Sequence, residues 1–315
     1  MKAVYLTDPH AYPNPVHPLR EALRQAVQNN IRLLICGGDF LPLEGGICID
    51  YQRRFLLGEF SEFLQECVQQ QVQFIFMPGN EDLQCLDETA MAIAKRHLGV
   101  QFVHRRPAET GAGLTSPQFI GYSCVPDFWS PLKDRCRLDN TASVPVTAHS
   151  GDNVMSVLPD GGQTEFGFRH LSGSEWAQVA MALPTIQEDL LALAHDVSPE
   201  DWSRTVFLCH CPPSGMDLAV NGAGERFGSA AVRSFVLKVQ PSLVLSGHFH
   251  NSPSVTGRLW GMLGNSMVIQ PGIGMLAFLE LPDRTVPGPN GYNPGRKSLP
   301  LGEPTFMALD DGKTS

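Results

Sequence analysis

The sequence predicts an α/β fold, and three observations support this prediction. Apolar runs of strand length alternate with amphipathic helical segments along the chain. Each predicted strand ends in a polar loop that contains glycine or proline. The 315 residues are 43% hydrophobic, which is enough to bury a sizeable core in one domain or two small ones and excludes an unfolded linker.

The first hundred residues show the strand and helix alternation most clearly. The segment 51–70 is the strongest helix, because Leu56, Phe60, Phe63 and Cys67 recur at spacings of three and four and form one apolar face. The other elements expected here are strands at 2–7, 31–36 and 72–77 and helices at 18–29 and 86–98.

The second half of the chain is less regular. Between 103 and 171 one strand, 119–125, stands out in a polar stretch, and we expect this region to be a long insertion or a cap-like loop. The remaining elements expected are helices at 173–194 and 229–238 and strands at 204–209, 243–245, 267–270 and 275–281. We therefore place the folded domain at 1–282 and a proline- and glycine-rich tail at 283–315 that wraps the surface or lacks order.

Composition and charge exclude several classes of function. The net charge is −9, which disfavours nonspecific binding to nucleic acid or to an anionic membrane, since both depend on a basic surface. No apolar stretch is long enough to span a bilayer, and the first ten residues do not resemble a signal peptide. The eight cysteines form no C-x-x-C pair, so we expect free thiols and a cytoplasmic protein.

Potential metal ligands follow five of the predicted strands. Loops at the carboxyl ends of strands in an α/β sheet converge on one crevice, so these side chains can meet there. Carboxylates, imidazoles and an amide form a mixed set that suits Mn, Fe, Zn or Ni, and seven donors predict two ions that share a bridging carboxylate. The seven candidates are Asp8, His10, Asp39, Asn80, His210, His248 and His250.

The same residues carry a family resemblance. Asp8-x-His10, Gly38-Asp39, Gly79-Asn80, His210 and Gly247-His248-x-His250, in this order, resemble the five-block signature of the calcineurin-like metallophosphoesterases. The stretch from His210 to Gly215, which reads H-C-P-P-S-G, is similar to an uncharacterised bacterial and archaeal branch of that family.

The resemblance implies a four-layer α/β/β/α sandwich of two mixed sheets flanked by helices. It also implies that two divalent or trivalent metal ions bind, with Asp39 as the bridging ligand. Asp8, His10 and His250 would complete the first site, and Asn80, His210 and His248 the second. The implied reaction is in-line attack on phosphorus by a hydroxide that bridges the metals. Two divalent ions less two aspartates and the hydroxide leave a charge of about +1 for a phosphate.

One position departs from the commoner family pattern. Many relatives have histidine after the asparagine, whereas this chain has Glu81, followed by Asp82. Glu81 can donate a proton only if its pKa is raised towards neutrality; otherwise the chain needs good leaving groups or a histidine from the insertion, such as His149 or His170. Asp82 either orients the loop by hydrogen bonding, the interpretation we prefer, or takes part in proton transfer.

We therefore expect a dinuclear metal-dependent phosphoesterase, and among these a phosphodiesterase for a small or cyclic nucleotide-like ester. Asn80, Glu81, Asp82 and His248 are the candidate catalytic residues. The alternatives are a phosphomonoesterase and a non-catalytic metal-binding scaffold of the same fold. A nuclease is disfavoured because the sequence shows neither a basic stripe nor stacking aromatics that would follow a nucleic-acid strand. We expect the cations at 133, 135 and 137 to lie on a solvated loop rather than to contact a substrate phosphate. The sequence leaves the oligomeric state open.

Overall fold

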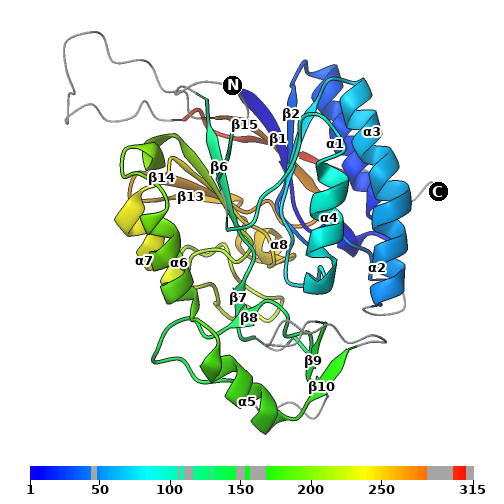
Figure 1. Cartoon of the computed structure of the whole chain (residues 1–315). Helices are drawn as coiled ribbons and strands as arrows, with labels where there is room; N and C mark the ends of the chain where they lie inside the picture. The colour runs from blue at the N-terminus through cyan, green and yellow to red at the C-terminus, as the bar shows by residue number, and fades with distance from the viewer. Residues whose placement is uncertain are drawn as a thin grey trace.

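A computed structural model describes residues 1–43, 48–105, 107–109, 116–128, 130–146, 153–156, 168–281 and 301–309. Its elements are arranged around two six-stranded mixed sheets that face each other, with helices on both outer sides (Figure 1). This is the four-layer α/β/β/α sandwich that the sequence resemblance implied.

The first sheet is built mainly from the N-terminal part of the chain. Its strand order is β16-β15-β1-β2-β3-β4, in which β1 to β4 run parallel and β15 and β16 are antiparallel to their neighbours. The strands are β1 Lys2–Leu6, β2 Leu33–Cys36, β3 Gln73–Phe76, β4 Val100–Phe102, β15 Met275–Glu280 and β16 Thr305–Ala308.

The second sheet has the order β13-β14-β12-β11-β6-β5. Strands β14, β12, β11 and β6 run parallel, and β13 and β5 close the two edges in antiparallel pairs. The strands are β5 Pro107–Glu109, β6 Gln118–Tyr122, β11 Thr205–Cys209, β12 Leu243–Leu245, β13 Trp260–Leu263 and β14 Ser266–Ile269.

Helices cover the outer face of each sheet. The first sheet packs against helices of the N-terminal part, which are α1 Val16–Gln28, α2 Ile49–Phe55, α3 Ser61–Gln69 and α4 Asp87–Ala94. The second packs against α6 Ile186–His195 and α7 Ala230–Val239. Four short helical turns lie in the connecting segments: η1 Pro9–Ala11, η3 Gln84–Leu86, η4 Asp201–Arg204 and α8 Ser252–Thr256.

A third apolar layer lies between the two sheets. Side chains of β1, β2 and β3 that point away from the helices, such as Ile35, join one core cluster with Phe119, Leu208 and Leu245 of the second sheet. Alternation along each strand therefore gives the sheets two buried faces, which explains why their strands read as continuous apolar runs. Tyr5 also joins the sheets directly, because its hydroxyl donates to the carbonyl oxygen of Ser246 at 2.8 Å.

The elements from β7 to α5, between residues 125 and 182, form a small core of their own. Strands β7 and β8 pair in parallel, β9 and β10 pair in antiparallel fashion, and helix α5 packs beside them around buried Trp176. Their bounds are β7 Val125–Pro126, β8 Cys136–Arg137, β9 Asn153–Met155, β10 Arg169–Leu171 and α5 Gly173–Ala182. Strands β5 and β6 belong to the second sheet, so the stretch 103–171 contributes to the sandwich. The same stretch contributes β7 to β10 to the small core, and we call β7 to β10 together with α5 the additional layer.

Two predicted helices differ in the structure from their sequence prediction. The segment 51–70 forms α2 and α3 joined by a π-helical turn, η2 Leu56–Phe60, where Gly58 leaves helical geometry. The segment 173–194 divides into α5 and α6, because Pro184 interrupts the helix and Thr185 caps the next one with a capping box to Glu188. One apolar face continued across the break, so periodicity alone concealed it.

The prediction of a solvated loop at 133–137 was wrong. Lys133, Arg135 and Arg137 are all buried. The Lys133 ammonium donates to Asp127 Oδ1 at 2.7 Å, and the Arg135 guanidinium donates to Asp87 Oδ1 at 2.5 Å. Buried cations need such partners, which their sequence spacing does not reveal.

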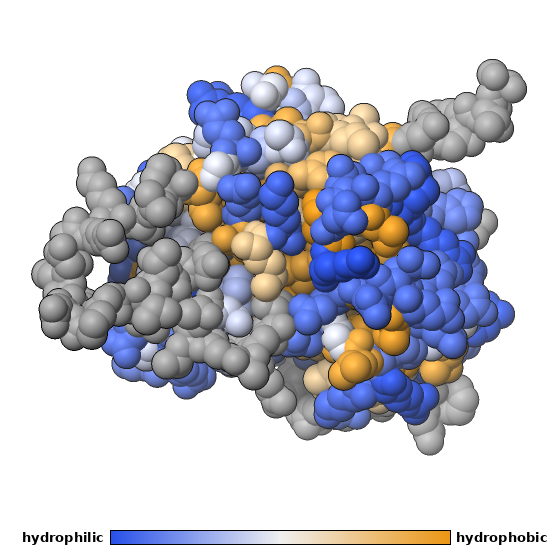
Figure 2. Space-filling model, turned by 90° about the horizontal axis from the view of Figure 1, so that it is seen from above, coloured by the Kyte–Doolittle hydropathy of each residue, from blue (hydrophilic) through white to orange (hydrophobic). Residues whose placement is uncertain are grey.

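The described part of the tail also differs from the expectation of a wrapping or unordered segment. Strand β16 pairs with β15 and forms an edge of the first sheet, whereas residues 282–300 and 310–315 lie outside the described residues. The molecular face seen in Figure 2 carries many hydrophilic side chains with apolar areas between them. Among the described helices, none is long and apolar enough to cross a membrane.

Candidate metal centre

The predicted ligands come together at the carboxyl ends of five parallel strands. Asp8 follows β1, Asp39 follows β2 and Asn80 follows β3, all in the first sheet. His210 follows β11, and the loop with His248 and His250 follows β12, in the second sheet. Because the sheets face each other, the two sets of loops meet across the sandwich, and the seven side chains lie within one centre.

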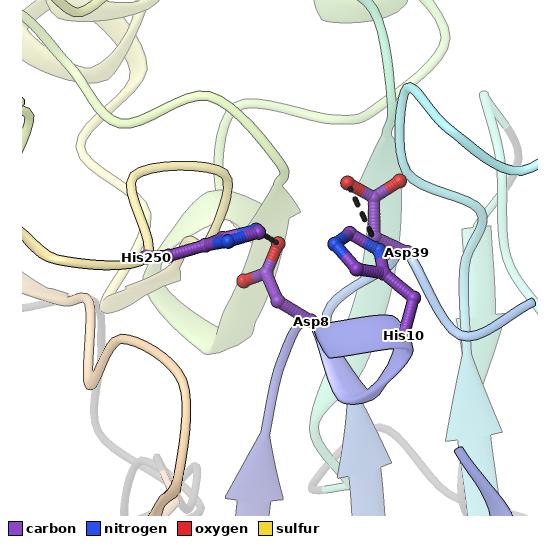
Figure 3. Close-up of side chains that lie close together, drawn as sticks. All are labelled: Asp8, His10, Asp39 and His250. Atoms are coloured by element: carbon purple, nitrogen blue, oxygen red, sulfur yellow. Dashed lines mark ion pairs between the residues drawn. The ribbon is translucent and has the colours of Figure 1, made fainter. Parts of the chain in front are cut away.

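The first group consists of Asp8, His10, Asp39 and His250. One donor atom from each lies within 4.8 Å of the others. His250 Nε2 is 3.3 Å from Asp8 Oδ1, and His10 Nδ1 is 3.6 Å from Asp39 Oδ2. Figure 3 shows the four side chains directed towards one another from three separate loops. This is the set that the family resemblance assigned to one ion.

The second group consists of Asp39, His210 and His248, with Asn80 beside them. One donor atom from each of the first three lies within 4.8 Å of the others. His210 Nε2 is 3.0 Å from Asp39 Oδ2 and 3.1 Å from Asn80 Oδ1, while its Nδ1 is 3.0 Å from the carbonyl oxygen of Gly37. Asp39 therefore belongs to both groups, which is the position of a bridging ligand.

Two glycines of the sequence blocks are required by close packing. A Cβ on Gly79 would lie 2.2 Å from Asp39 Oδ1, and one on Gly247 would lie 2.1 Å from Thr7 Oγ1 and 2.5 Å from Asp8 Oδ2. Any larger residue would displace the aspartates. The glycines before Asn80 and His248 thus allow the backbone of one loop to lie against the carboxylate of another.

Three candidate ligands have strained backbone conformations. Asp8, Asp39 and His248 adopt positive φ angles of 55°, 52° and 68°. A non-glycine residue in this region costs on the order of 1 kcal/mol or more. The surrounding bonds hold these conformations, since the Asp8 N–H donates to the Gly38 carbonyl oxygen and the His248 N–H donates to Asp8 Oδ1, at 3.0 and 3.1 Å.

Burial and mutual charge set the protonation of the centre. Burial alone would raise the pKa of Asp8, but its interactions with His250 and His210 lower it to about 2. Asp39 likewise has a pKa well below its usual range, because the charges of His210 and His10 outweigh its burial. Burial lowers the pKa of His10, and that of His248 to about 3. The aspartates are therefore ionised and these two histidines neutral at pH 7, the forms that can coordinate a metal. At His210 the charges of Asp39 and Asp8 outweigh burial and raise the pKa to about 9, and Asp8 likewise raises the pKa of His250, so these two imidazoles must lose a proton when a metal binds.

The donor set fits a pair of transition-metal ions. The buried Nδ1 atom of His10 has no hydrogen-bond partner, although it faces Asp39. A buried nitrogen without a partner lowers the stability of the fold unless the nitrogen binds a ligand such as a metal ion. Imidazole and carboxylate donors around a shared aspartate match Mn, Fe, Zn or Ni better than Ca or Mg.

Glu81 and Asp82 occupy different surroundings. Glu81 reaches the edge of the centre, where its Oε2 is 3.6 Å from His10 Nε2 and its side chain is 28% exposed. Burial, and then the charge of Asp39, raise the pKa of Glu81 to about 7. Asp82 is fully enclosed and accepts hydrogen bonds from the backbone N–H groups of Phe40, Leu41 and Gly79. The geometry favours a loop-orienting role for Asp82.

The Asn80 loop is held by residues that the sequence analysis missed. Buried Gln52 on α2 donates to the Glu81 carbonyl oxygen at 3.0 Å and accepts from the Leu83 N–H at 3.1 Å. The Arg135 Nε donates to the carbonyl oxygen of Asp82 at 3.2 Å. A signal for Gln52 was present, since it lies four residues before Leu56 on the apolar face of its helix, where a polar side chain needs a specific partner.

The two histidines considered as alternative proton donors are not placed at the centre. His170 lies on β10 in the additional layer and is exposed, and it does not belong to either ligand group. His149 lies outside the described residues. Glu81 is thus the titratable group, among those considered as a general acid and described by the structure, that reaches the candidate ligands.

Comparison with known proteins agrees with this geometry. The sequence model of a family described as calcineurin-like phosphoesterase matches residues 1–252, which is most of the chain. A search of curated proteins found no significant match.

Solved structures of similar fold were also found. One crystal structure is 14% identical, covers 98% of this chain and 99% of its own, and superimposes with a TM-score of 0.56. That of TT1561 from Thermus thermophilus is 16% identical, with coverages of 88% and 93% and a TM-score of 0.50. A dimetal phosphatase from Danio rerio is 13% identical, with coverages of 89% and 92% and a TM-score of 0.47. At identities this low, the first two bear on the fold alone.

Proposed function

Because the chain belongs to the calcineurin-like phosphoesterase family and is a metal-dependent phosphoester hydrolase, we propose that it is a dinuclear phosphodiesterase acting on a small or cyclic nucleotide-like ester. The observation that carries the dinuclear assignment is the shared position of Asp39 between two groups of buried donors. We assign Asp8, His10 and His250 to one ion and Asn80, His210 and His248 to the other.

The preference for a diester is supported by the charge of the centre. In the described chain, the ion pairs of Asp8, Asp39 and Glu81 are all with histidines, and no lysine or arginine takes part in them. Two divalent ions, two aspartates and an anionic nucleophile then leave about +1, which matches a diester with one negative charge better than a monoester with two. Lys133, Arg135 and Arg137 do not change this balance, because they are buried among other partners.

The ions, when bound, supply positive charge at the phosphate and lower the pKa of water in the centre. The chain's own residues do the rest. Asp39 and Asp8 hold the two sets of loops at fixed distance, and the Asn80 amide and the His248 imidazole lie on the side of the second group, where they can contact a phosphate oxygen. Glu81, at the open edge, is our candidate for the group that donates a proton to the leaving alcohol.

The experiment that tests this function combines metal content with hydrolysis. Purified wild type and Asp39→Ala are analysed for bound metals and assayed with bis(p-nitrophenyl) phosphate and p-nitrophenyl phosphate. Asp50→Ala serves as a matched control, because Asp50 is an exposed aspartate on α2 whose partner is Arg53 in the same helix. We expect two metals and a diester preference in wild type and in the control, and loss of both metals and activity in Asp39→Ala.

Two results would replace the proposal with its alternatives. A higher kcat/KM for the monoester than for the diester would identify a phosphomonoesterase. Two bound metals without hydrolysis of a broad panel of esters would identify a metal-binding scaffold. The cytoplasmic location, the absence of nucleic-acid binding and the domain boundary at 282 stay predictions.

A further inference from the structure

Three phenylalanine rings lie together beside the second group of ligands. Phe128 stacks on the His248 imidazole with a centroid distance of 5.6 Å and an interplanar angle of 22°. Phe227 and Phe249 stack on each other at 5.7 Å, and both present their rings roughly perpendicular to Phe128, at 5.5 and 5.8 Å. We call Phe128, Phe227 and Phe249 the aromatic cluster.

The aromatic cluster is assembled from three separate segments. Phe128 follows β7 in the additional layer, Phe227 lies in the long loop between His210 and α7, and Phe249 stands between His248 and His250. The Phe227 N–H donates to the Ala219 carbonyl oxygen at 2.7 Å, which ties this ring to its own loop. Phe227 and Phe249 therefore lie on loops that carry candidate ligands, whereas Phe128 comes from the additional layer.

The rings of the aromatic cluster differ in exposure from those of the main core. Phenylalanines that pack between α3 and the first sheet, such as Phe60, Phe63 and Phe74, are completely buried. Phe128, Phe227 and Phe249 are each only partly buried. Apolar aromatic surface left open beside a catalytic centre is available to a ligand.

Charge at the centre is distributed unevenly. The carboxyl of Glu81 lies on the side of His10, in the first group, whereas the aromatic cluster lies on the side of His248. The cations nearest in sequence are Arg226, which donates to Asp217 Oδ1 at 2.8 Å, and Lys133, which is engaged with Asp127 and with the Phe128 carbonyl oxygen. The His248 side therefore offers ring faces and edges rather than ionic contacts.

We propose that the aromatic cluster is a subsite that binds a planar aromatic group of the phosphate ester, either an aryl group or a nucleobase. The inference rests on the proposed phosphodiesterase function and names what the enzyme recognises beyond the phosphate. A ring that packs against Phe128 and Phe227 exchanges water for offset or edge-to-face aromatic contacts. The subsite contacts the group esterified to phosphorus that remains after the leaving group departs.

The test uses substrates that share one leaving group. Methyl, phenyl and thymidine-5′ p-nitrophenyl phosphates all release p-nitrophenolate, so their rates differ only through the group that is retained. We expect wild type to prefer the phenyl or thymidine ester to the methyl ester by roughly three- to tenfold in kcat/KM. Phe227→Leu should remove this preference through a raised KM, and Phe227→Tyr should keep it.

A matched control and an independent readout accompany the kinetics. Phe278→Leu changes a partly buried phenylalanine on β15, away from the centre, and should leave the preference unchanged. Inhibition of wild type by phenylphosphonate should exceed that by methylphosphonate, and Phe227→Leu should weaken only the former. Melting curves establish that each variant is folded.

The possible results separate the two proposals. Absence of hydrolysis of all three esters by the metal-loaded wild type would overturn the phosphodiesterase function itself. Hydrolysis of the methyl ester, with equal preference in wild type and Phe227→Leu, would overturn the aromatic subsite alone. If Phe227→Leu loses the preference for the phenyl ester, the thymidine ester or both, the subsite is supported. The ester whose preference is lost then identifies whether an aryl group or a nucleobase binds there.

Discussion

Replacement of Gly79 by alanine tests whether the packing of one backbone against another determines the metal centre. The new Cβ would lie 2.2 Å from Asp39 Oδ1, 2.5 Å from its Cγ and 2.4 Å from its backbone nitrogen. Rotation of the Asp39 side chain cannot relieve the contact with its backbone nitrogen. Either the Asp39 loop or the Asn80 loop must therefore move.

The displacement can be estimated from these distances. Carbon and oxygen atoms in contact are usually more than about 3 Å apart, so the loops must separate by about 1 Å. The two loops are held together by the Glu81 N–H to Asp39 Oδ1 bond at 2.7 Å and the Leu41 N–H to Asp82 Oδ1 bond at 2.8 Å. Overpacking of this kind costs about 1–3 kcal/mol of stability, and a shift of about 1 Å in a reacting group reduces activity roughly 100-fold.

The assay compares Gly79→Ala with a glycine that has free space. A Cβ on Gly222, in an exposed loop, would meet no atom within 4 Å, so Gly222→Ala is the matched control. For both variants, urea unfolding gives the free energy of unfolding, elemental analysis gives metal content, and bis(p-nitrophenyl) phosphate gives kcat/KM. We expect a folded Gly79→Ala protein with reduced metal content and about 1% of wild-type kcat/KM.

Three outcomes would refute this reasoning. If Gly79→Ala retained both metals and activity within about threefold of wild type, the contact with Asp39 would not determine the centre. If its stability fell while kcat/KM stayed unchanged, the loops would relax without moving the ligands. Equal effects in Gly222→Ala would show that the loss of a glycine, rather than this contact, causes them.

Three further predictions follow from the same structure. Gln52→Leu leaves the Glu81 carbonyl oxygen and the Leu83 N–H without their buried partner, so it should lower the free energy of unfolding by about 2–4 kcal/mol in urea titrations. The control variant, Gln69→Leu on the exposed side of α3, should change this free energy by less than about 0.5 kcal/mol. Glu81→His should speed hydrolysis of alkyl esters, whose leaving groups need a proton, and an unchanged or lower rate in a stopped assay would contradict the prediction that an imidazole is the better proton donor at this position. Burial and neighbouring arginines lower the pKa of His104 well below its ordinary 6.5, so the unfolded chain binds a proton that the folded chain does not. Stability should therefore fall as the pH drops below about 6.5, and His104→Asn should lose up to about 2 kcal/mol less than wild type between about pH 7 and pH 5.

The α/β class and the ligand residue types were predictable because their signals are local. A strand of four to six apolar residues followed by a glycine-marked polar loop is readable from its own segment, as at Asp39 after β2 and Asn80 after β3. The order of the blocks then restricted the fold through family resemblance. Helix breaks were less readable, since Pro184 interrupts an apolar face that continues on both sides.

The supporting contacts of the centre were not predictable because they join distant segments. Gln52 bonds to the loop at 81–83, and Arg135 bonds to Asp82 and Asp87 from the additional layer. Sequence spacing predicted that Arg135 lies in solvent, and only its partners explain why a guanidinium can be buried there. The aromatic cluster was missed for the same reason, as its three rings come from three loops.

The sequence by itself determined which chemical groups this protein can bring to a phosphate: aspartates, histidines and an asparagine, each at the end of a strand, and no basic surface. Only the tertiary structure decided how those groups are shared. The His248 N–H meets the carboxylate of Asp8 across 240 residues, and Asp39 reaches both groups of donors. Such distances depend on the stacking of two sheets and on glycines that let their loops touch, which no local pattern of side chains encodes.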